Sequence, residues 1–285
     1  MGKPFTSDSI KVRPPAVAGR FYPGHSTELR RTIESFLNRV QPDETAAPKA
    51  VIAPHAGYDY SGPIAASAYA RFASARNVIT RVVLIGPSHY VSFDGLAASG
   101  AEGFATPLGL VPVDTDAVRQ LCSLPQVTVL DEAHAREHSL EVHLPFLQVV
   151  LNDFKIVPLV VGEATDHEVA GVIDALWNGP ETRFVISSDL SHYHDYTKAR
   201  ELDSFTSRAI EQLRPQDIGE EHACGRIPIR GLLHVARQHG LRARTVDLRN
   251  SGDTTGPRSQ VVGYGAFVFE GNWLNSVAAF VGDAE

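Results

Sequence analysis

Short continuous apolar runs alternate along the chain with segments of helical periodicity. The runs lie at Ala50–Ala53, Arg81–Ile85, Lys155–Val161, Arg183–Ser187 and, near the end, Val261–Phe269. Uninterrupted apolar strands are typical of a parallel sheet covered on both faces, because a strand with one wet face alternates apolar and polar residues. The pattern therefore predicts an α/β fold with a mainly parallel or mixed central sheet flanked by helices.

Helical patterns fill the intervals between these runs. We expect Ser26 to cap a helix over Thr27–Val40, because Leu29, Ile33 and Phe36 recur on one stripe after it. Further helices are expected at Ile64–Phe72, Asp166–Trp177, Thr197–Leu213 and Ile229–Gln238. No internal repeat or long linker interrupts the alternation, so we expect residues 1–285 to form a single domain.

The composition narrows the class of protein. A net charge of −7 with 21% charged residues offers no basic footprint for nucleic acid, and the most basic stretch, residues 242–249, is short enough to be a solvated strand. No apolar run approaches the length of a membrane span, and residues 1–15 lack the apolar core of a signal peptide. The two cysteines cannot make a disulfide scaffold. We expect a cytoplasmic protein that binds neither membranes nor nucleic acid.

Histidines gather where the predicted strands end. His55 follows Ala50–Ala53, His89 follows Arg81–Ile85 and the Gly86-Pro87 break, and His192 follows Arg183–Ser187 together with Asp189. Ligand sites in open α/β sheets lie beyond the carboxyl ends of the strands. A single histidine after a strand is usually a hydrogen-bonded surface residue, but three at one edge indicate metal ligands or acid/base groups.

Two other segments carry chemical groups. Cys224 precedes a predicted helix and is either a reactive thiol favoured by the helix N-terminus or a small buried apolar residue. The segment EHSLEVHLPFL contains His138, Glu141 and His143, but their spacing differs from that of zinc-protease motifs. A metalloprotease is therefore disfavoured. The sequence also lacks a G-x-S-x-G elbow, a G-x-G-x-x-G turn and a P-loop, so neither a serine hydrolase nor a nucleotide-binding protein is supported.

The motifs AGRFYP, APHAGYDYSG, LIGPSHYV, EHSLEVHLPFL, SSDLSH, ACGRIPI and NSGDTTG occur in one order across nearly the whole chain. In this order and content the sequence resembles the Memo family, which is similar to the class III extradiol dioxygenases. The resemblance implies their α/β fold, with a non-haem iron held by two histidines and a third ligand.

Carried over by motif, the resemblance assigns metal ligands to His55, His89 and Cys224. It gives His192 the role of acid/base, and it places Phe21 and Tyr60 in the lining of a pocket that accepts a small molecule or, in some members, a peptide.

Four further residues are candidates at this site on the sequence alone. Asp189 either orients His192 or a bound water, or caps the next helix. Tyr58, Glu141 and His143 are candidates for supporting the pocket.

Cys224 stands where a dioxygenase would offer glutamate. A carboxylate suits Fe(II) with open positions, whereas a thiolate shifts the preference toward copper or zinc. We expect Fe(II) or Cu, with Zn as the further alternative, and a metal-dependent oxidoreductase. The alternative is a non-enzymatic module that uses the same pocket for a peptide or partner, and a zinc hydrolase is more distant. The resemblance also implies AMMECR-like and radical-SAM proteins as pathway partners.

Overall fold

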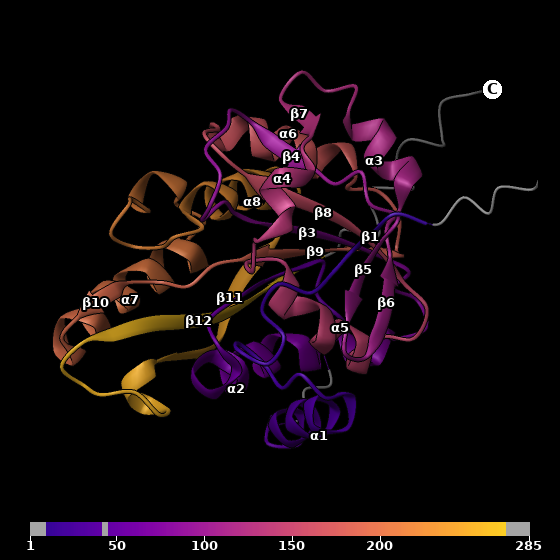
Figure 1. The fold of residues 1–285 in the computed structure, drawn as a ribbon. Coiled ribbons are helices and arrows are strands. Elements are labelled where there is room, and N and C mark those ends of the chain that lie inside the picture. The colour runs from indigo at the N-terminus through magenta and orange to yellow at the C-terminus, as the bar shows by residue number, and fades with distance from the viewer. Residues whose placement is uncertain (1–9, 42–44, 272–285) are drawn as a thin grey trace, which may run out of the picture.

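The computed structural model describes residues 10–41 and 45–271, so residues 1–9 of the N-terminal stretch considered above lie outside the described part. Within it a nine-stranded mixed sheet forms the centre (Figure 1). The strands run in the order β10 (His192–His194), β12 (Val261–Glu270), β2 (Ala50–Ala53), β9 (Thr182–Ser187), β3 (Arg81–Pro87), β8 (Lys155–Val161), β4 (Leu96–Ala98) and β7 (Val127–Val129), with β11 (Arg242–Asn250) paired to β12. A smaller sheet contains β1 (Val12–Arg13), β5 (Gly103–Thr106) and β6 (Gly109–Pro112).

Helices cover the central sheet on both sides, as Figure 1 shows, with α1, α2 and α5 below it and α6 and α8 above. The helices are α1 (Ser26–Leu37), α2 (Tyr58–Tyr69), α3 (Thr115–Leu121), α4 (Asp131–Ala135), α5 (Leu144–Val150), α6 (Asp166–Ala175), α7 (Tyr196–Glu211) and α8 (Arg226–Gln238). Strands β2, β9, β3 and β8 are parallel and nearly all their residues are buried. The predicted α/β class, with a mixed and largely parallel sheet, is confirmed.

Three predicted boundaries were wrong. Strand β3 does not break at Gly86-Pro87, because Gly86 and Pro87 stay in register with Val160 and Val161 of β8. Gly86 is required there, since a Cβ on it would lie 2.9 Å from the hydroxyl oxygen of Ser139.

Helix α2 begins at Tyr58 and runs through Gly62-Pro63 instead of starting after them. Pro63 cannot donate a hydrogen bond to the carbonyl of Asp59, and the Thr255 hydroxyl donates to that carbonyl at 3.4 Å instead. Helix α1 likewise contains Ser26 as its first residue, and its N-cap is His25, which makes no side-chain cap.

Candidate metal centre

The three strands that precede the candidate histidines are direct neighbours. The sheet order β2-β9-β3 is parallel throughout, so all three strands end at one edge. His55 lies two residues beyond β2, His89 lies two residues beyond β3, and the β9 end leads through Asp189 to His192. The predicted convergence of the strand ends is therefore present. The His55 and His89 rings lie 5.1 Å apart between centroids, nearly at right angles.

Hydrogen bonds fix the tautomer of His55. The Ser187 hydroxyl donates to the carbonyl oxygen of Ser139 at 2.5 Å, so its oxygen accepts from the His55 Nδ1 at 2.7 Å. The proton of His55 therefore sits on Nδ1 and leaves a lone pair on Nε2. His55 is buried, and burial first and then neighbouring histidines lower the pKa of His55 well below its usual range. A neutral imidazole with a free Nε2 is the form that binds metal ions.

His89 is oriented by a buried carboxylate. The Glu137 Oε1 accepts from His89 Nδ1 at 2.8 Å, and its Oε2 accepts from the backbone N–H of His89 at 2.6 Å. Burial alone would raise the pKa of Glu137, but the hydrogen bonds from His89 and the backbone of Ser139 hold it at about 2. Glu137 therefore stays ionised and turns Nε2 of His89 outward. This carboxylate–histidine pair is the usual support of a metal ligand.

A third imidazole, that of His138, was not predicted as part of the site. The ligand atoms of His55, His89 and His138 all lie within 4.8 Å of one another. The His138 ring stacks on His89 at 4.6 Å between centroids, and burial lowers the pKa of His138 to about 4. The density of the EHSLEVH segment was the available signal, but His138 follows no strand and its proximity to His89 depends on a contact 49 residues apart in sequence.

Cys224 approaches the cluster from the turn before α8. Its Sγ lies 3.4 Å from Nε2 of His55 and 3.6 Å from the carbonyl oxygen of Asp189. Among the described residues, the set at this site whose ligand atoms all lie within 4.8 Å of one another contains His138 rather than Cys224. Burial, and then the Asp189 carboxylate, raises the pKa of the Cys224 thiol to about 12. Cys224 is therefore a thiol in this state, and it contacts His55 at the nitrogen that carries the lone pair.

His143 and Glu141 are both buried, and His143 shares the Ser187 hydroxyl with His55. His143 donates from Nε2 to the Ser187 hydroxyl at 2.8 Å, and its Nδ1 accepts from the hydroxyl of Tyr69 at 2.7 Å, so both of its nitrogens are used. Glu141 is fully buried, where it pairs with Arg13 and accepts hydrogen bonds from Val17 and the Tyr22 hydroxyl.

The remaining candidates are divided between the interior and the rim. Tyr58 is buried and its hydroxyl donates to the carbonyl of Val142 at 2.7 Å. Tyr60 is 43% exposed. The ring of Phe21 lies 4.8 Å from that of His138.

Asp189 and His192 both interact with His55. Asp189 is buried and accepts from the backbone N–H of His55 at 2.8 Å, so it holds the His55 loop. Burial raises the pKa of Asp189 to about 7. His192 lies close enough to lower the pKa of His55 by its charge, and burial lowers the pKa of His192 itself. His192 is thus predominantly neutral near pH 7 and able to accept a proton.

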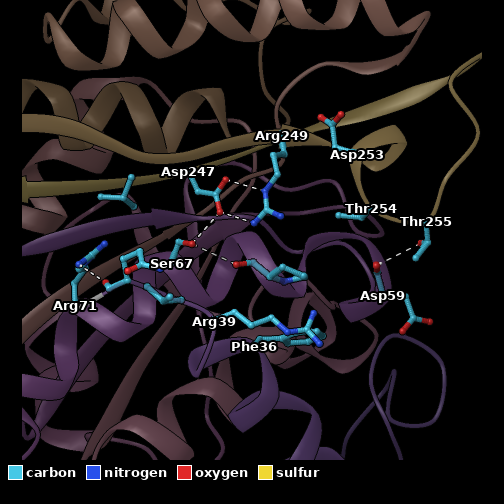
Figure 2. Close-up of a pocket in the computed structure, with 14 residues that line it drawn as sticks. Phe36, Arg39, Asp59, Ser67, Arg71, Asp247, Arg249, Asp253, Thr254 and Thr255 are labelled. Carbon is cyan, nitrogen blue, oxygen red and sulfur yellow. Dashed lines mark hydrogen bonds and ion pairs between the residues drawn. The ribbon is translucent and has the colours of Figure 1, made fainter. Parts of the chain in front are cut away.

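A cavity of about 350 Å³ opens beside the cluster and is lined by His89 and Cys224, among others. A larger cavity of about 680 Å³ lies between α1, α2 and β11 (Figure 2). Its lining contains none of the clustered histidines, and Asp247 there is already engaged by Arg249 and Ser67. The smaller cavity is therefore the one that adjoins the candidate chemistry.

A second group of metal-ligand residues, Asp166, His167 and His234, lies between α6 and α8. The Asp166 carboxylate there is bound by Arg230 at 2.8 Å. The nearby guanidinium makes this group a poorer cation site than the neutral histidines at the strand ends.

A sequence profile described as "Memo-like protein" matches residues 13–268. The chain belongs to the Memo family. The match spans His55, His89, His138, Cys224 and every other candidate named above.

Relatives in the Memo family extend over nearly the same length. A "MEMO1 family protein" of Aeropyrum pernix is 40% identical over 281 residues, which cover 90% of this chain and 99% of that protein. Proteins of the same description from Aquifex aeolicus and Methanobrevibacter smithii are 36% and 35% identical, each over 91% of this chain and their own full length. In the described residues of this Memo-family chain, no helix combines the length and apolar character needed to cross a membrane.

Proposed function

We propose that this protein binds one transition-metal ion through His55, His89 and Cys224 and uses it for redox or oxygen chemistry on a small molecule. The observation that carries the proposal is the protonation pattern of the two histidines. His55 and His89 each commit Nδ1 to a buried hydrogen-bond partner, Ser187 and Glu137, which leaves Nε2 free. Metal-binding histidines have this arrangement, because the second nitrogen fixes the ring and the tautomer.

The distance between Cys224 and His55 supports the same site. A tetrahedral centre with a metal–sulfur bond near 2.3 Å and a metal–nitrogen bond near 2.05 Å separates the two donor atoms by roughly 3.6 Å. The observed separation between Sγ and Nε2 is 3.4 Å. The thiol proton would leave on binding, because only a thiolate is a strong ligand. The separation of Cys224 and His55 therefore fits a mixed nitrogen and sulfur centre.

The donor set favours particular metals. Imidazole nitrogens suit iron, copper and zinc, whereas a thiolate favours copper or zinc over the Fe(II) preferred by a carboxylate. We propose Fe(II) or Cu as the physiological ion, with Zn as the alternative. When bound, such an ion would polarise or exchange electrons with a ligand in the adjoining cavity.

The chain's own residues would prepare and complete that chemistry. His192 would accept or deliver a proton beside the centre, since burial keeps its imidazole neutral. Asp189 would keep His55 in place through the backbone hydrogen bond. His138 would contact the bound molecule from the same side as His89, on which it stacks.

Metal analysis of protein produced in metal-replete medium and purified without oxygen tests the proposal. We expect close to one iron, copper or zinc ion per chain, a severe loss in His89→Ala and Cys224→Ser, and retention in His138→Ala. Cys122→Ser is the matched control, because Cys122 is the other free cysteine and is exposed. A wild-type protein without a near-stoichiometric ion contradicts the metal centre. If His138→Ala loses as much metal as Cys224→Ser, His138 is a ligand too.

A second candidate is a module that binds a peptide or partner without catalysis. The observation in its favour is a set of large exposed aromatic side chains, Tyr60 at 43%, Tyr90 at 48% and Tyr193 at 71%. Exposed tyrosines are common anchors of protein interfaces. Under this alternative the His89→Ala variant would retain partner binding, whereas under the metal proposal it would lose both the ion and turnover.

A further inference from the structure

The cavity beside the proposed metal centre is also lined by a cationic side chain. His89 and Cys224 line it, and so does Arg226, the first residue of α8. The lining also contains the hydroxyl groups of Ser88, Tyr90 and Ser92 and the carboxylate of Glu163. A molecule in this space would therefore meet the candidate metal ligands and a guanidinium at the same time.

Arg226 is only lightly engaged. Its Nη2 pairs with the Glu220 carboxylate at 2.8 Å, and the Glu220 side chain is 83% exposed. An ion pair with so exposed a partner contributes little, because Glu220 exchanges readily with water. The guanidinium has five N–H donors in a planar fork, so it can bind a second carboxylate or replace the first.

We infer that this cavity binds a small organic monocarboxylate, with its carboxylate on Arg226 and its other end directed toward His89 and Cys224. The inference rests on the proposed metal centre for the orientation of the ligand but not for its charge. Glu163 lines the same space and is exposed, so its carboxylate disfavours a second anionic group in the ligand.

The size of the cavity limits the ligand. Its volume of about 350 Å³ lies at the lower end of the range for small-molecule sites, which is roughly 300–1,000 Å³. A folded partner or a long peptide cannot enter a space of this size, although a single side chain could. The inference therefore names a free small acid as the ligand and separates it from the peptide-binding alternative.

Binding of a series of terminal hydroxy monocarboxylates, two to five carbons long, tests the inference by titration calorimetry. Each acid is paired with its neutral amide, and both are titrated into metal-loaded and metal-free protein whose metal content has been measured. We expect at least one acid to bind about tenfold tighter than its amide, and Arg226→Gln to weaken that acid ten- to hundredfold, as loss of a charge-assisted hydrogen bond requires.

Matched variants separate the charge of Arg226 from a structural effect. Arg230→Gln removes a guanidinium one turn further along α8 that is paired with Asp166, and we expect it to leave binding unchanged. Glu220→Gln should strengthen binding, because it frees Arg226. All variants are first compared by thermal unfolding.

The outcomes distinguish this inference from the metal proposal. Equal binding of acids and amides, or an Arg226→Gln variant that binds the acids as the wild type does, overturns the monocarboxylate site even if the metal is present. If the protein takes up no metal but still binds the acids through Arg226, the monocarboxylate site is supported and the metal proposal fails.

Discussion

Glu137 holds His89 at two points, with one carboxylate oxygen 2.8 Å from Nδ1 and the other 2.6 Å from the backbone N–H. The first contact fixes the ring and its proton, and the second fixes the turn that carries the ring. Both contacts come from a residue that is only 2% exposed. Nε2 of His89, the nitrogen proposed to bind the metal, is therefore oriented by a buried residue on the opposite, Nδ1 side of the ring.

Glu137→Gln should weaken metal binding about ten- to hundredfold, the usual effect of losing the partner behind a ligating histidine. The amide can present its oxygen to only one of the two N–H groups, so the ring loses either its orientation or its tautomer. Competition titration against a chelator measures the affinity. Glu132→Gln, on the exposed side of α4, is the control. Unchanged affinity in the Glu137 variant would mean that His89 is not a ligand.

Glu141→Gln should lower the free energy of unfolding by about 3–5 kcal/mol, because it leaves the buried Arg13 guanidinium without a compensating charge. Urea unfolding measures the loss. The double variant Arg13→Met, Glu141→Met should recover only part of it, since removing both charges leaves no unpaired ion but the Val17 N–H and the Tyr22 hydroxyl still lose their acceptor. We expect the metal content of folded Glu141→Gln to stay at the wild-type level, and a selective loss of metal would assign Glu141 to the site instead.

The sequence was sufficient for the strands that position the site but not for the contacts that complete it. Lys155–Val161 forms β8 with the predicted boundaries. A continuous apolar run of this length is typical of a strand that is buried on both faces of the sheet. Strands such as β4 and β7 were not predicted, since three residues carry too little periodicity. His138 and Glu137 were also missed as site residues. They reach His89 by tertiary contact from a loop, and no local pattern encodes such a contact.

Lys49 should make stability depend on pH. This residue is fully buried, and burial followed by the charge of Arg183 lowers the pKa of Lys49 to about 7. Between pH 7 and its ordinary pKa the unfolded chain binds a proton that the folded chain does not. The Lys49 contribution to stability therefore rises with pH in that window, with a slope that approaches about 1.4 kcal/mol per pH unit.

The difference in unfolding free energy between the wild type and Lys49→Met isolates this contribution, because other groups titrate equally in both. We expect the free energy of unfolding of the wild type to rise relative to that of the variant between pH 7 and pH 9. Urea unfolding at four or more pH values measures it. A difference that stays constant over this range would place the pKa of Lys49 outside the window.

The backbone conformation of Tyr193 should lower the stability of the protein. Its φ of 61° lies in the left-handed region, which a bulky residue rarely adopts, and its side chain is 71% exposed next to His192. Strain of this kind costs about 1 kcal/mol or more and is concentrated at functional sites. Asparagine tolerates the same backbone conformation, so Tyr193→Asn should raise the free energy of unfolding by about 1 kcal/mol.

Tyr90→Asn is the control, because Tyr90 is also exposed but does not have a positive φ, and it should bring no gain in the free energy of unfolding. Thermal and urea unfolding measure both variants. A Tyr193→Asn variant that is less stable than the wild type would show that the tyrosine ring contributes more by packing than the backbone loses by strain.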